Sequence, residues 1–180
     1  PKEKFLLYGI LMEAHEDQLS DIYESESIEA EMKQVFKEKY VDVIKQLETT
    51  VIHKVAIDKD TLEYRGVGEV PGFVLNQFSM DEHDGYFRIA TTVDISDFGM
   101  DLEEEEEQYS SVYVLDSALS IVGKVEHLAP DEEIYAARFM QDRAYLVTFR
   151  RTDPLFVIDV ATPTNPRLLG KLKIPGFSTY

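Results

Sequence analysis

The chain contains no cysteine, and none of its apolar runs is long enough to span a membrane. The lack of cysteine excludes disulfide frameworks, thiol catalysis and zinc sites with cysteine ligands. The apolar stretch at residues 5–12 has only eight residues, and an acidic segment follows it instead of a small-residue cleavage site. We interpret this stretch as a buried strand or a helix turn, and we expect no membrane span.

Positive charge is scarce. The chain has 18 basic and 35 acidic residues, which gives a net charge of −17 over 180 residues. A polyanion such as DNA or RNA would be repelled unless a basic stripe were present, and the sequence has none. Arg167, Lys171 and Lys173 form only a small basic patch, which we interpret as the solvated side of a strand. We therefore expect no nucleic-acid partner.

Catalytic signatures are also missing. The nine glycines do not cluster into a phosphate-binding loop, and the serines lack a Gly-x-Ser-x-Gly motif. The four histidines, His15, His53, His83 and His127, do not follow a metal-ligand spacing. We predict no catalytic residue and no bound cofactor, which favours a binding function over an enzymatic one.

Two weak candidates for cation binding exist. His83 lies in a predicted hairpin turn beside Asp81 and Asp84, although polar residues are common in turns without any metal. The second candidate is the run of five carboxylates at 103–107, represented by Glu103 and Glu105. We expect this run to form a solvated loop, and loose calcium binding there is the alternative to having no metal site.

The second half of the chain contains a weak internal repeat. The segment Ser-Ser-Val-Tyr-Val-Leu-Asp ending at Asp116 resembles Pro-Leu-Phe-Val-Ile-Asp ending at Asp159. Each is followed by an apolar run with a Gly-Lys pair, at Gly123 and at Gly170, and an earlier copy ends in Val-Gly-Glu-Val at residues 67–70. The aspartates are 43 residues apart and the Gly-Lys pairs 47 apart, which is close to the period of a β-propeller blade.

Alternating apolar residues and turn signals predict a series of short strands after residue 49. The first two strands form a pair, and the rest form two up-and-down quartets, each with the topology of a propeller blade. The predicted strands span residues 51–58 and 62–70, then 74–80, 86–93, 111–116 and 119–125, then 134–140, 143–150, 155–160 and 167–174. An Asp-Gly pair at Asp84 predicts a tight turn between the third and fourth strands.

The predicted fold is therefore mainly β: a partial β-propeller of about two four-stranded antiparallel blades plus a half blade, with an N-terminal amphipathic helix. We divide the chain into an N-terminal segment with a helical insertion, residues 1–48, and propeller blades, residues 49–180. The helix is predicted over residues 25–48, where apolar side chains recur every three or four positions without glycine or proline. Two and a half blades cannot close a ring of four to eight, so we expect the chain to be a fragment of a longer protein.

Aromatic side chains of the predicted strands are expected to fill the space between packed sheets. This set comprises Phe78, Phe87, Tyr113, Phe139, Tyr145, Phe149 and Phe156.

Several segments resemble a family of archaeal and bacterial secreted proteins with a C-terminal β-propeller domain. The resemblance covers most of residues 49–177, in segments 49–55, 68–72, 75–80, 84–92, 112–116, 137–140, 142–149, 153–159 and 172–177. It implies a propeller, export from the cell and a helical insertion before residue 49, and it implies no known reaction.

The expected function is that of a non-enzymatic β-propeller module that binds a protein or a glycan at the cell surface or outside the cell. Location there follows only from the resemblance, and a cytoplasmic location is the alternative. Two other functions stay open: a hydrolase with its site in the central funnel of a whole ring, and a cation-dependent adhesion module. Open blade edges also favour a homo-oligomer, because unpaired strand edges invite pairing with a second molecule.

Overall fold

The computed structural model describes residues 48–94, 108–149 and 154–173, all within one compact unit, residues 43–180. The helix predicted over residues 25–48 lies outside these ranges except for Glu48, and so do Glu103 and Glu105. In the described part of the chain, no helix is long and apolar enough to cross a bilayer.

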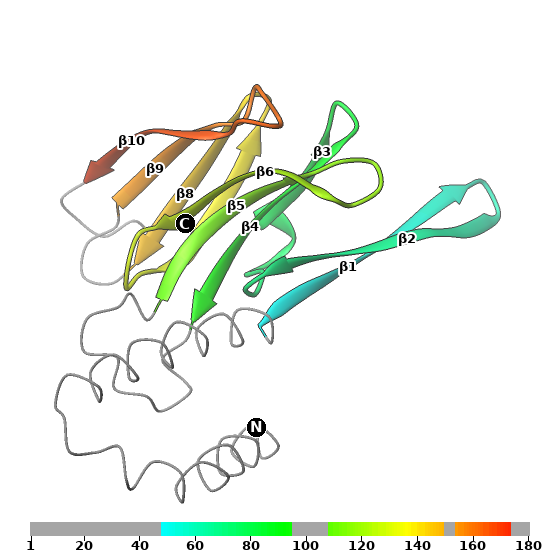
Figure 1. Ribbon diagram of the computed structural model, residues 1–180, viewed down its shortest axis with the longest axis horizontal. Coiled ribbons are helices and arrows are strands. Elements are labelled where there is room, and N and C mark those ends of the chain that lie inside the picture. The colour runs from blue at the N-terminus through cyan, green and yellow to red at the C-terminus, as the bar shows by residue number, and fades with distance from the viewer. Residues whose placement is uncertain (1–47, 95–107, 150–153, 174–180) are drawn as a thin grey trace, which may run out of the picture. The chain divides into compact units, whose positions relative to one another are not determined.

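The described residues form three antiparallel sheets, and the strand order follows the chain (Figure 1). A two-stranded sheet pairs β1 (Thr49–Asp58) with β2 (Thr61–Pro71). The first four-stranded sheet has the order β3-β4-β5-β6, and the second has the order β10-β9-β8-β7. Their strands are β3 (Met80–His83), β4 (Tyr86–Asp94), β5 (Gln108–Leu115), β6 (Ile121–Leu128), β7 (Glu133–Met140), β8 (Arg143–Phe149), β9 (Pro154–Asp159) and β10 (Arg167–Lys173). The predicted pair and two quartets are confirmed.

One predicted strand is wrong. Residues 74–79 are not a strand, and β3 begins only at Met80, the last residue of the predicted segment. A 3-10 turn, η1 (Gln77–Ser79), occupies this place, because the Asn76 side chain accepts a hydrogen bond of 2.9 Å from the backbone N–H of Phe78. Upstream, Phe73 makes only an isolated bridge to Thr92. Local side-chain capping therefore overrides the apolar alternation of this segment.

The tight turn between β3 and β4 is confirmed. Asp84 and Gly85 have φ angles of 50° and 81°, so both lie in the left-handed region. This geometry matches the right-handed twist of the flanking strands and is easily adopted by Asp-Gly. The turn fixes the direction of the side chains at the end of this hairpin.

The sequence repeat corresponds to a repeated turn. Asp116 follows β5 and Asp159 ends β9, so each aspartate closes the third strand of its four-stranded sheet. Oδ1 of Asp116 accepts a hydrogen bond of 2.9 Å from the N–H of Ala118, and Oδ1 of Asp159 accepts one of 3.1 Å from Ala161. The same aspartate turn therefore leads into the fourth strand of each sheet.

The core lies between successive sheets. Ala90 and Val112 of the first four-stranded sheet pack in one buried cluster with Leu146, Phe156 and Ile158 of the second. A buried hydrogen bond of 3.2 Å, from the N–H of Ile134 to Oγ1 of Thr92, crosses the same junction.

A second cluster joins the two-stranded sheet to the first four-stranded one. Val70 of β2 is buried there with Ile89, Tyr113 and Leu115. Successive sheets are thus held face to face by side-chain packing, which accounts for their alternating apolar residues.

Not every aromatic residue fills this core. Tyr113 and Phe156 are buried as predicted. Phe78 is 49% exposed, because it lies in η1 instead of a strand, and the Arg138 guanidinium covers its ring at 3.8 Å from the centroid. Phe149 is partly exposed at the end of β8 and contacts the ring of Tyr135. Strand ends and turns leave these two rings at the surface.

Candidate functional site

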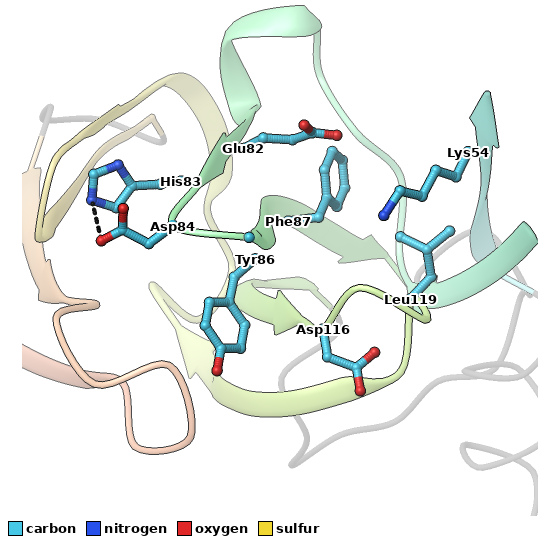
Figure 2. Close-up of a pocket in the computed structure, with 9 residues that line it drawn as sticks. Lys54, Glu82, His83, Asp84, Tyr86, Phe87, Asp116 and Leu119 are labelled. Atoms are coloured by element: carbon cyan, nitrogen blue, oxygen red, sulfur yellow. Dashed lines mark ion pairs between the residues drawn. The ribbon is translucent and has the colours of Figure 1, made fainter. Parts of the chain in front are cut away.

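A cavity of about 280 Å³ lies where three parts of the chain meet: β1, the β3–β4 hairpin and the turn between β5 and β6. Figure 2 shows Glu82 and Lys54 approaching it from opposite sides, with the Phe87 ring between them. Nine described residues line the cavity: Lys54, Glu82, His83, Asp84, Gly85, Tyr86, Phe87, Asp116 and Leu119.

The repeated turns position most of these side chains. The Asp84-Gly85 turn brings Glu82 and Tyr86 to the end of its hairpin. The aspartate turn after β5 contributes Asp116 and Leu119, and Leu119 adopts a left-handed φ of 62°. Lys54 reaches the cavity from the neighbouring two-stranded sheet, where it lies beside a break in the β1–β2 register. The site is thus assembled from two sheets.

The charges around the cavity are unbalanced. Glu82, Asp84 and Asp116 carry carboxylates, whereas Lys54 supplies a single ammonium group. That ammonium donates a hydrogen bond of 3.0 Å to the backbone carbonyl of Ser117. With histidine neutral, the lining has an excess of negative charge, so the cavity favours a cationic group over an anionic one.

The side chains of the predicted cation cluster do not gather at one point. Asp81 binds Arg88 with both carboxylate oxygens, whereas Nε2 of His83 lies 3.5 Å from Oδ2 of Asp84. Within residues 48–94, 108–149 and 154–173, no three metal-ligating side chains gather around a common point. Weak calcium binding at this turn, or at Glu103 and Glu105, stays a prediction.

Sequence reasoning missed Lys54 and Asp116. They lie 62 positions apart (116 − 54), and only the packing of one sheet on the next brings them to one cavity. It also missed Arg88, which is buried at 2% exposure. The signal that could have identified Arg88 is its position as the one basic residue of β4, between apolar residues, because a charged residue inside a buried strand needs a partner.

Chemically, the cavity is suited to binding. Its lining combines carboxylates, one ammonium group and two aromatic rings, which are groups that can bind a cation. Its aromatic side chains, Tyr86 and Phe87, supply apolar surface and ring faces that attract cations.

Two carboxyl groups outside the cavity, Asp159 and Glu126, have lowered pKa values. The N–H of Ala161, with further contributions from Arg143 and Arg167, lowers the pKa of Asp159 below its ordinary value. Burial alone would raise the pKa of Glu126, but hydrogen bonds from Lys124 and Tyr113 outweigh it and lower that pKa. Both groups stabilise strands and turns, and neither belongs to the cavity.

Comparison with known proteins agrees with this architecture. Residues 18–180 match the model of the β-propeller domain family. The chain belongs to this β-propeller family. Its four-stranded antiparallel sheets are therefore propeller blades: β3–β6 form one blade, β7–β10 form the next, and β1–β2 form a half blade before them.

Two archaeal relatives extend the comparison. An uncharacterised protein of Methanocaldococcus jannaschii is 40% identical over 168 residues, which cover 87% of this β-propeller chain and 26% of the relative. An uncharacterised protein of Archaeoglobus fulgidus is 46% identical over 136 residues, which cover 76% of the chain and 20% of the relative. The chain thus spans about a quarter or less of the relatives it matches.

Proposed function

We propose that this β-propeller chain is a non-catalytic interaction module, and that the cavity between its half blade and first full blade binds a basic side chain of a partner protein. The observation that carries the proposal is the excess of carboxylates around a cavity with aromatic walls. Guanidinium and ammonium groups are attracted by carboxylates and by aromatic faces. A partner protein also suits the propeller architecture, in which turns from different blades present side chains at one place.

Glu82 is the acidic group best placed to bind such a side chain. It is exposed, and Figure 2 shows its carboxylate beside the Phe87 ring. Asp116 is less available, because its Oδ1 already accepts hydrogen bonds from the N–H groups of Ala118 and Ser120. Asp84 faces His83 at the rim. We therefore expect Glu82 to contribute most to binding.

The test is binding of a fluorescent oligo-arginine peptide, measured by anisotropy with an oligo-glutamate peptide as reference. Glu82→Gln removes one charge from the cavity and should weaken oligo-arginine binding about threefold to fivefold, or about 0.6–1 kcal/mol. Tyr86→Leu removes a ring and should weaken it as well. The matched control is Glu133→Gln, which removes the same charge from an exposed position on β7.

Equal weakening by Glu82→Gln and Glu133→Gln would show attraction to the net charge alone and would overturn the proposal. Binding of neutral oligosaccharides, unaffected by Glu82→Gln, would favour a glycan ligand. A requirement for calcium would favour the adhesion module.

A location at the cell surface or outside the cell is supported by the resemblance to secreted proteins. Fractionation of the source organism, with immunodetection of the protein, would test it, and a purely cytoplasmic signal would contradict it.

A further inference from the structure

The basic side chain of the cavity, Lys54, stands at an irregularity of the half blade. The β1–β2 register shifts between Lys54 and Val55. Gly66 lies opposite Lys54 and has a φ of 153°, which an L side chain rarely adopts. A β-bulge of this kind changes the direction of a side chain and is common next to functional sites. The bulge therefore accounts for the direction of Lys54 into the cavity.

The ammonium group of Lys54 is not neutralised by an ion pair. It donates a hydrogen bond of 3.0 Å to the uncharged carbonyl of Ser117, and no carboxylate in the described part of the chain pairs with it. Other cations of the first two sheets are paired: Arg65, Arg88 and Lys124 each contact a carboxylate. An ammonium group has three N–H donors, so two donors of Lys54 stay available to a ligand.

The cavity thus has two ends of opposite charge. Glu82 and Asp84 belong to the β3–β4 hairpin, whereas Lys54 reaches the cavity from β1. Figure 2 shows the Glu82 carboxylate beside the Phe87 ring and the Lys54 side chain extending from β1 toward the same ring. An aromatic surface therefore separates an acidic end from a basic end.

The third carboxylate of the cavity does not cancel the basic end. Oδ1 of Asp116 accepts hydrogen bonds of 2.9 Å from the N–H groups of Ala118 and Ser120, which offset its charge. Asp116 thus stabilises the turn after β5 and forms no ion pair with Lys54.

A basic side chain alone would satisfy only one end of this cavity. It would pair with Glu82 and leave the Lys54 ammonium without a counter-charge. A carboxylate on the same residue would supply that charge. The cavity volume of about 280 Å³ is just below the range of about 300–1,000 Å³ that is typical of small-molecule pockets, so it suits the end of a chain better than a long segment.

We propose that the cavity binds the C-terminal residue of a partner protein, and that this residue is arginine or lysine. Glu82 accepts hydrogen bonds from the side-chain cation, Phe87 contacts its aliphatic part, and Lys54 donates to the terminal carboxylate. Charge-assisted hydrogen bonds at both ends determine the orientation of the bound residue. The inference rests on the function proposed above and specifies which part of the partner enters the cavity.

The test compares two fluorescein-labelled peptides of the sequence Gly-Ser-Gly-Ser-Arg, one with a free C-terminal carboxylate and one with a C-terminal amide. Anisotropy measures their binding to the full chain. The free carboxylate should bind about threefold to fivefold more tightly. The direction is diagnostic, because a net charge of −17 by itself attracts the amide, which has one negative charge fewer.

Lys54→Met removes the ammonium group, so it should abolish the preference for the free carboxylate. Lys54→Arg keeps the charge and should retain the preference. The matched control is Lys59→Met, which removes the same charge from an exposed position in the β1–β2 turn and should also retain it. Thermal melts of the three variants check that each is folded.

The outcomes separate this inference from the proposed function. If the amide binds as tightly as the free carboxylate and Glu82→Gln weakens both, carboxylate recognition is overturned and binding of a basic side chain stands. A preference for the free carboxylate that persists in Lys54→Met, or that is lost in Lys59→Met as well, would also overturn the inference. Binding that is absent or insensitive to Glu82→Gln would contradict the proposed function and the inference together.

Discussion

Arg88 and Asp81 form a two-pronged ion pair across the β3–β4 hairpin. Nε of Arg88 donates to Oδ1 of Asp81 at 2.7 Å, and Nη2 donates to Oδ2 at 2.5 Å. The remaining guanidinium nitrogen, Nη1, donates to the backbone carbonyl of Gln141 in the β7–β8 turn. A single buried side chain therefore fixes the hairpin that borders the cavity and connects two successive blades.

Asp81→Asn should destabilise the protein strongly, because it leaves the Arg88 charge buried without its counterion. Loss of one partner of a buried pair costs about 3–5 kcal/mol, and we expect the lower end of this range because the Asp81 side chain is 30% exposed. The double variant Asp81→Leu/Arg88→Met should lose less than Asp81→Asn alone, since no buried charge remains. Urea unfolding of the three proteins measures this. A double variant that loses as much stability as Asp81→Asn, or more, would show that the unpaired Arg88 charge does not cause the loss.

The hydrogen bond between Thr92 and Ile134 should stabilise the junction between the two full blades. Thr92→Val keeps the shape of the side chain but leaves the N–H of Ile134 without its acceptor at a buried site. The expected cost is about 1–3 kcal/mol. Denaturant titration measures it, with Thr61→Val, at the exposed first residue of β2, as the control. An equal loss of stability from both variants would show that the missing hydrogen-bond acceptor at Thr92 does not cause the destabilisation.

Substitution by alanine should destabilise the chain at Gly123 and have little effect at Gly170. At Gly123 the added methyl group would overlap the β9–β10 turn, so Gly123→Ala should cost about 1–3 kcal/mol through overpacking. At Gly170 the methyl group would meet no described atom, so Gly170→Ala should change the stability of the isolated chain little. Thermal melts of dilute protein compare them. A melting temperature unchanged by Gly123→Ala would contradict the close contact between Gly123 and the β9–β10 turn.

Local chemistry made much of the fold predictable from the sequence. The Asp84-Gly85 pair and the repeated aspartates Asp116 and Asp159 determine turns through their own backbone and side-chain hydrogen bonds. The alternation of apolar residues between these turns then predicted the strands of each blade. The strand predicted at 74–79 is wrong because the Asn76 side chain caps a 3-10 turn there. The apolar pattern of this segment does not distinguish a short strand from a capped turn.

The candidate site was far less predictable. The polar residues Asp81, His83 and Asp84 are neighbours in sequence, but the structure places His83 at the end of β3 beside Asp84, whereas Asp81 binds Arg88. Lys54 and Asp116 meet at the cavity only because one sheet packs on the next. Contacts of this kind depend on the register and packing of whole sheets, which no local pattern encodes.

Acid should weaken the turn held by Asp159. The pKa of this carboxyl group is lowered in the folded chain, first by the N–H of Ala161 and then by the arginines Arg143 and Arg167. A group whose folded pKa lies below its unfolded value stabilises the protein above the unfolded value and loses that contribution as the pH falls through the folded pKa. The unfolded value for aspartate is about 3.9.

Asp159→Asn keeps an oxygen acceptor for Ala161 but removes the charge. We therefore expect it to lower the melting temperature at about pH 7, and the difference from wild type to shrink as the pH falls from about 5 to below 3. At each pH the melting temperature of Asp159→Asn is compared with that of the wild type, because protonation of other carboxylates also relieves repulsion in a chain of net charge −17. Glu133→Gln, at an exposed position, controls for that relief. A gap between Asp159→Asn and wild type that stays constant across this pH range would show that the Asp159 charge does not stabilise the turn.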